Sequence, residues 1–237
     1  MNEIAVAPEK NVFQKLVGIF TAPTETFESI DRKPDWLVPF IINVVIGLIL
    51  FFLTSSIRMT DQIATMQAKG VPAEQIQMIQ NQMSGPMKYI NLVAVPIVIF
   101  VFWAIISGLF LFAGNIILGG NSKFWKLFSM VGWTSVVGLV GGILGAALIL
   151  MKKTTHGVTT SLAMLLPTPV VGEKPSALYR LLSQFDLFMI WQVALWIIGF
   201  SVLYKVTKGK SASVVLTLWG IWIVLAVALG GLFSFGG

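Results

Sequence analysis

The residues that could do chemistry in this chain are few and scattered. Its one histidine, His156, has no second histidine and no cysteine with which to bind a metal or activate a nucleophile. The glycines from 138 to 145 have no lysine directly after them, so they cannot hold a phosphate as a nucleotide-binding loop does. Glu25 follows Pro23 at an expected helix start, where a carboxylate stabilises the helix. These residue types predict a protein that is not an enzyme and that uses no metal or cofactor.

A few polar side chains lie inside or at the ends of long apolar runs: Asn43, Asn115, Asp186 and Gln192. In a bilayer such groups either hydrogen-bond to other helices or line a path for an ion or solute. We expect the first role, with Asn43 bonded to another helix, because the chain has no two equal halves. A small transporter or channel remains the alternative. The segment from Ser183 to Asp186 also fits a capping box at a helix start.

Methionines and glutamines are frequent between residues 58 and 88. Apolar residues keep helical spacing on both sides of the break at 70–72, which predicts two short interfacial helices. A thioether site for Cu(I) is the alternative, but no cysteine or histidine stands beside these methionines.

The composition places the chain in a membrane. Of its 237 residues, 56% are hydrophobic and 11% are charged, whereas soluble domains have about 25% charged residues. Apolar runs are long enough to cross about 30 Å of hydrocarbon as helices. We expect an all-α polytopic membrane protein with five transmembrane helices in contact with lipid. The expected spans are about 37–57, 89–118, 125–151, 183–204 and 212–233.

The N-terminal segment, residues 1–36, differs from the spans, which lie in a domain of residues 37–237. Val12, Leu16 and Phe20 recur at helical spacing with polar residues between them, which predicts an amphipathic helix on the membrane surface or against the bundle. Pro23 can open a second short helix.

Small residues form stripes on two of the expected spans. Such stripes let helices approach closely in lipid, where burial of apolar surface does not drive association. We expect the two stripes to pack together, with self-association as an alternative use. The first stripe consists of Gly138, Gly141, Gly142, Gly145 and Ala146, and the second includes Ala104 and Gly108.

The basic residues predict the orientation of the chain. Short loops that face the cytoplasm are enriched in lysine and arginine. We therefore expect the N-terminus in the cytoplasm and the C-terminus on the other side. The formal charge of +6 does not indicate nucleic acid, because the basic residues lie at the ends of spans. Those on the expected cytoplasmic side are Lys10, Lys15, Arg32, Lys33, Lys123, Lys126, Lys205, Lys208 and Lys210.

Two stretches resemble the Yip family of polytopic membrane proteins, and its short bacterial members in particular. The first is LVGIFTAPTETF (16–27) with the following Trp36, and the second lies around FDLF (185–188). Their order and spacing agree with the family across nearly the whole chain. The matching residues are Phe20, Pro23, Glu25, Phe27, Trp36, Asp186, Phe188 and Trp191, with Leu195 and Gly199 after them.

The resemblance implies an integral protein of the bacterial inner membrane, in some cases an accessory to an ABC-type exporter. Together with the stripes of small residues, it predicts a non-enzymatic protein that acts by helix association on a membrane-protein partner or on a second copy of itself.

Overall fold

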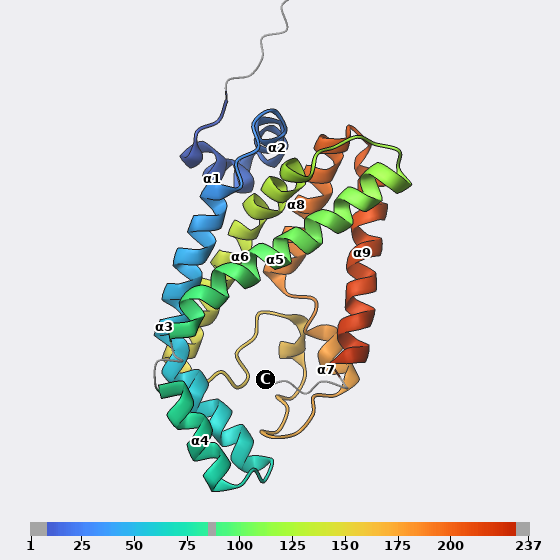
Figure 1. Ribbon diagram of the computed structural model, residues 1–237. Helices are drawn as coiled ribbons and strands as arrows, with labels where there is room; N and C mark the ends of the chain where they lie inside the picture. Colours follow the sequence, from blue (N-terminus) through green and yellow to red (C-terminus); the bar gives the residue numbers. More distant parts are fainter. Residues whose placement is uncertain (1–8, 85–88, 231–237) are drawn as a thin grey trace, which may run out of the picture.

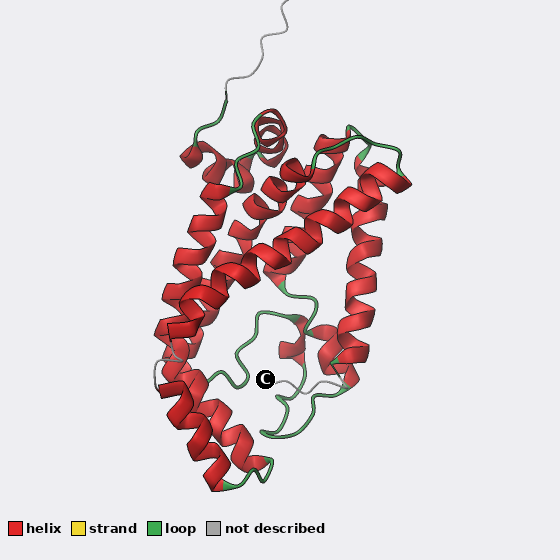
Figure 2. Cartoon of the chain, in the orientation of Figure 1, coloured by secondary structure: helices red, strands yellow, loops and turns green. Residues whose placement is uncertain are grey.

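The computed structural model describes residues 9–84 and 89–230, and these residues fold into helices joined by loops (Figures 1 and 2). The N-terminal helices α1 and α2 are followed by a bundle of longer ones. The elements are α1 (Val12–Thr21), α2 (Pro23–Arg32), α3 (Leu37–Ala68), α4 (Ala73–Ser84), α5 (Asn91–Phe112), the π-turn η2 (Ala113–Ile117), α6 (Phe124–Lys152), the 3-10 turn η3 (Leu162–Leu165), α7 (Ala177–Leu182), α8 (Leu187–Tyr204) and α9 (Lys208–Leu229).

Five helices in the described residues are long and apolar enough to cross a membrane, which confirms the expected all-α polytopic class. They are α3, α5 with its π-turn, α6, α8 and α9. Since the number of spans is odd, the hairpin of α1 and α2 and the end of α9 lie at opposite ends of the bundle (Figure 1).

Helix α3 is longer than its apolar run. It continues past residue 57 to Ala68 and ends before Gly70, whose φ is +73°. The first of the two short interfacial helices expected between residues 58 and 88 is therefore wrong, because residues 58–68 contain no glycine or proline that would end the helix. The second corresponds to α4.

Helix α6 is the central helix of the bundle. It packs against α3, α5 and α8 and also contacts α1 and α2. The stretch 127–137 of this helix is almost wholly buried, with Trp133 and Phe128 fully enclosed. The Trp196 Nε1–H of α8 donates to Thr134 Oγ1 of α6 at 2.8 Å, and this hydrogen bond joins the two antiparallel helices in the interior.

The segment between α6 and α8 folds back alongside the bundle. Leu162 N–H donates to the Phe185 carbonyl, and Leu187 N–H donates to the Thr160 carbonyl. Phe188, in the first turn of α8, lies against Gly141 of α6. At a rise of 1.5 Å per residue, Gly141 is about 16 Å from the end of α6, so α8 begins well inside the length of that helix. Irregular backbone at such a depth requires protein cover, and Ser161 and Ala163 are buried.

Candidate functional site at the N-terminal hairpin

The hairpin of α1 and α2 is defined by local signals. Asn11 Oδ1 accepts from Gln14 N–H and Gln14 Oε1 accepts from Asn11 N–H, both at 2.9 Å, which forms a capping box at the start of α1. Pro23 is the first residue of α2, as predicted. Gly18 lets the two helices meet, because a Cβ there would overlap Thr26 Oγ1.

A buried ion pair joins this hairpin to the membrane bundle. Lys15 Nζ lies 2.7 Å from Asp35 Oδ2, and the Lys15 side chain is only 5% exposed. Asp35 Oδ1 also accepts from Trp133 Nε1–H of α6 at 2.9 Å. The Lys15 ammonium lies 5.8 Å from the centroid of the same indole ring. One carboxylate thus connects α1, the start of α3 and α6.

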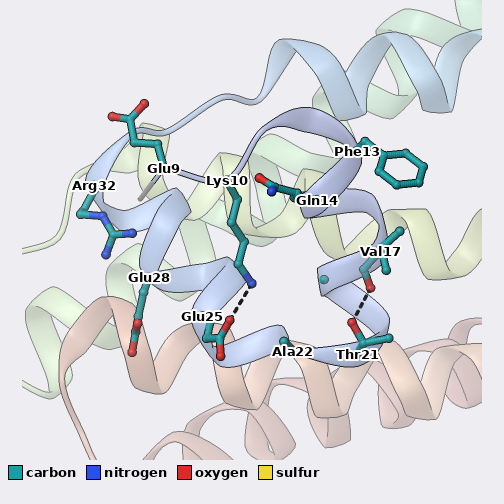
Figure 3. Close-up of a pocket in the computed structure, with 11 residues that line it drawn as sticks. Glu9, Lys10, Phe13, Gln14, Val17, Thr21, Ala22, Glu25, Glu28 and Arg32 are labelled. Atoms are coloured by element: carbon teal, nitrogen blue, oxygen red, sulfur yellow. Dashed lines mark hydrogen bonds and ion pairs between the residues drawn. The ribbon is translucent and has the colours of Figure 1, made fainter. Parts of the chain in front are cut away.

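Two further ion pairs hold the hairpin. Lys126 of α6 pairs with Asp31 of α2, and both side chains are partly buried. Lys10 pairs with Glu25 at 3.0 Å, across the gap between the two helices (Figure 3). Because Glu25 is 70% exposed, the second pair adds little stability.

Apolar contacts complete the docking. Ile19, Phe27 and Ile30 are fully buried between the hairpin and the bundle. The Phe20 ring meets Trp191 of α8 edge to face, with centroids 5.4 Å apart. We therefore expect the hairpin to move as one body with α6 and α8.

The outer face of α1 carries exposed apolar side chains, whereas the exposed residues of α2 are polar. Phe13 is 73% exposed, and Val12 and Val17 are also exposed. A cavity of about 460 Å³ lies between α1 and α2, with Phe13 and Val17 on one wall and Glu25 and Glu28 on the other (Figure 3). Along α1, the exposed Phe13 and Val17 lie on the side opposite to the buried Lys15 and Ile19.

The structure brings the two resembling stretches together. Phe20 contacts Trp191, and Phe27 lies beside Gly199, where a Cβ would stand 3.2 Å from its ring. Trp36 belongs to an aromatic cluster at the start of α3 and α6. Its members include Phe40, Phe100, Trp125 and Phe128.

The four polar residues expected in the spans do not form one path. Asn43 Nδ2 donates to the Pro39 carbonyl of its own helix at 2.8 Å, so the expected bond to another helix is wrong. The carbonyl one turn back in α3 satisfies this amide donor. Asn115 bonds both backbone groups of Ser122 and closes the loop before α6.

Asp186 is itself the N-cap of α8. Its Oδ1 accepts from Phe188 N–H at 2.9 Å and from Met189 N–H at 3.2 Å. The capping box that begins at Ser183 is therefore wrong, because the chain is still leaving α7 there and Ser183 caps the C-terminus of that helix. Gln192 lies partly buried beside Gly138.

The small residues of α6 have other neighbours than expected. Phe188 of α8 covers Gly141, and Leu50 of α3 lies nearest Gly142. Ala146 is buried, whereas no side chain comes within 4 Å of a Cβ at Gly145 or Gly108. The expected packing of this stripe on Ala104 and Gly108 is therefore wrong at these positions, because α8 and α3 occupy its flanks.

Alanine substitution distinguishes these glycines. At Gly141 a Cβ would stand 2.6 Å from the Phe188 ring, so we expect Gly141→Ala to destabilise the protein by about 1–3 kcal/mol. At Gly145 the space is open, and the better helix propensity of alanine predicts no loss. Thermal unfolding in detergent measures both variants. Equal midpoints would contradict the contact between α6 and α8.

Sequence reasoning does not find the ion pairs of the hairpin, because lysines at the ends of spans have the pattern of topology signals. Lys15 and Lys126 belong to the expected cytoplasmic charges, yet both pair with aspartates of the N-terminal segment. A signal is present in the sequence, since Lys15 stands three and four residues before Gly18 and Ile19, on the face that α1 buries.

Within the described residues, no three histidine, cysteine or acidic side chains are grouped to hold a metal ion.

Comparisons with known proteins identify the family of the chain. The model of the Yip1 domain family matches residues 17–230. Membrane protein YknW of Bacillus subtilis (strain 168) is 23% identical over 231 residues, which cover 94% of this chain and 92% of YknW. No solved structure gives a significant match. The family match runs from the hairpin to the end of the last span, and the chain therefore belongs to the Yip1 domain family of integral membrane proteins.

Proposed function

We propose that this protein is a non-enzymatic accessory or regulator of a membrane complex in the bacterial inner membrane. An ABC-type exporter is the class of partner that the family resemblance favours. The observation that carries the proposal is the hairpin, which is fastened to α6 by a buried ion pair and exposes apolar side chains of α1 beside polar residues of α2. Exposed apolar patches with polar surroundings are typical of interaction surfaces.

The hairpin is suited to transmit binding into the bundle. Lys15 and Asp35 connect it to α6, and Phe20 and Phe27 connect it to α8. A partner that binds the outer face of α1 therefore acts on two membrane helices at once. Lateral association through α6 is a second contact of the same kind, since Gly138 and Gly142 remain exposed to the surroundings of the bundle. We place the hairpin on the cytoplasmic side, in accordance with the lysines around it.

Substitutions on the outer face of α1 should weaken association without unfolding the protein. Phe13 and Val17 have exposed side chains, so Phe13→Ser with Val17→Ser should cost little stability. We expect the tagged double variant to recover about tenfold less exporter from solubilised membranes than the unsubstituted chain, because exposed aromatic anchors carry much of an interface's energy. Quantitative mass spectrometry of the purified complexes measures this ratio.

A matched control and a functional assay complete the test. Thr24→Ala removes an exposed polar side chain of the same hairpin, away from Phe13, and should leave recovery unchanged. Full recovery with the double variant would contradict the proposal. Solute flux in liposomes that disappears in Asp186→Asn would instead support a transporter.

A further inference from the structure

A second cavity lies at the opposite end of the bundle from the hairpin. The C-terminal part of α3 and the segment 155–180 enclose a volume of about 700 Å³, which reaches Gly230 after α9. Permanently basic side chains on its walls outnumber the carboxylates. The basic residues are Arg58, Lys69, Lys174 and Arg180, joined by His156, and the carboxylates are Asp61 and Glu173.

Asp61 holds one wall of this cavity in place. Its Oδ2 accepts from Thr154 Oγ1–H at 3.1 Å, from Thr155 Oγ1–H at 2.7 Å and from the Thr155 backbone N–H. These bonds fasten the start of the 155–180 segment to α3. The three neutral donors stabilise the ionised carboxylate of Asp61 where it stands, and the four lysine and arginine side chains still outnumber the two carboxylates of the lining.

Both guanidinium groups are oriented before any ligand arrives. Arg58 Nε donates to Thr54 Oγ1 at 3.0 Å. Arg180 Nε donates to the Val227 carbonyl at 3.3 Å, and its Nη1 donates to the Pro175 carbonyl at 2.6 Å. An arginine has five donors in a planar fork that matches the oxygens of a phosphate. Fixing the fork in advance lowers the entropy lost on binding.

The cavity lies where the apolar runs of α3 and α9 end. Arg58 directly follows the apolar run of α3, and Arg180 contacts Val227 near the last residue of α9. Basic side chains at the ends of spans interact with anionic headgroups. We propose that this cavity binds the phosphate group of an anionic lipid headgroup. This inference is independent of the proposed function of the hairpin.

Binding to the full chain in detergent tests this site. The probes are short-chain phosphatidylglycerol, phosphatidylcholine of the same chain length, and inorganic phosphate. We expect phosphatidylglycerol to bind about tenfold more tightly than phosphatidylcholine. The double variant Arg58→Gln with Lys69→Gln should remove that preference, because hydrogen bonds to charged groups contribute enough binding free energy to account for a tenfold ratio. Native mass spectrometry counts the bound lipid, and microscale thermophoresis gives the affinities.

The control removes the same charge from the same end of the bundle. Lys152 and Lys153 lie at the end of α6 and do not line the cavity. The double variant Lys152→Gln with Lys153→Gln should therefore retain the preference for phosphatidylglycerol. If inorganic phosphate binds as tightly as the lipid, and the cavity variant loses affinity for both, the result supports the site and identifies a soluble phosphate as its occupant. Equal binding of the two lipids, or an equal loss in the control variant, would overturn the proposal.

Discussion

Replacing Asp35 with alanine should release the hairpin from the bundle. The substitution leaves the Lys15 ammonium buried without its counter-ion, and the cost of such a charge is about 3–5 kcal/mol for fully buried pairs. Asp35 keeps a quarter of its side chain exposed (25%), so we expect a value near the lower end, about 3 kcal/mol. This free energy corresponds to about a hundredfold increase in the population of the undocked hairpin.

The chain contains no cysteine, which makes the undocking measurable. Ser29 of α2 is 1% exposed, so the nearly isosteric Ser29→Cys places a single thiol under cover. Its rate of maleimide labelling should rise about a hundredfold when Asp35→Ala is added, in proportion to the open population.

An exposed ion pair of the same segment is the control. Lys33 and Glu9 lie 3.1 Å apart with side chains 69% and 59% exposed, so Glu9→Ala should change the labelling rate little. The double variant Lys15→Met with Asp35→Leu should recover slow labelling, because apolar side chains can replace a buried pair without loss. Trp133 Nε1–H keeps a bond to the Asp35 backbone carbonyl at 3.2 Å in that variant. Fast labelling of the double variant would show that a charge at Asp35, and not the filling of the site, is required.

Truncating Phe27 to alanine should have the largest effect on stability. The ring is fully buried and lies against Gly199 of α8. Loss of a buried phenylalanine costs about 3–5 kcal/mol, because the apolar contacts disappear and a cavity remains. For a chain of this length we expect the unfolding midpoint in detergent to fall by roughly 10 °C.

Phe13 provides a matched comparison on the same hairpin. Its ring is 73% exposed, so Phe13→Ala should move the midpoint by no more than about 1–2 °C. The proposed function predicts the reverse for association. Phe13→Ala should lower the recovery of the partner, whereas a folded Phe27 variant should retain it. If both variants lowered the midpoint equally, the observed docking of α2 on α8 would be contradicted.

The sequence alone determined the features that depend on neighbouring residues. Apolar runs longer than a bilayer crossing identified five membrane helices, and Pro23 identified the start of α2. The family also followed from local patterns, since its motifs are short runs with regular spacing. These properties depend on composition and periodicity within one element, and both can be read along the chain.

The tertiary structure decided which partners these elements meet. Lys15 is buried because Asp35 and Trp133 come to it from 20 and 118 positions away, and no local pattern encodes that meeting. Gly141 is tightly covered and Gly145 is open because the Phe188 ring lies at one of them and not at the other. The residue type of a glycine or a lysine does not reveal whether a neighbouring helix covers it. Only the placement of the neighbouring helices therefore determines what such a residue contributes to stability.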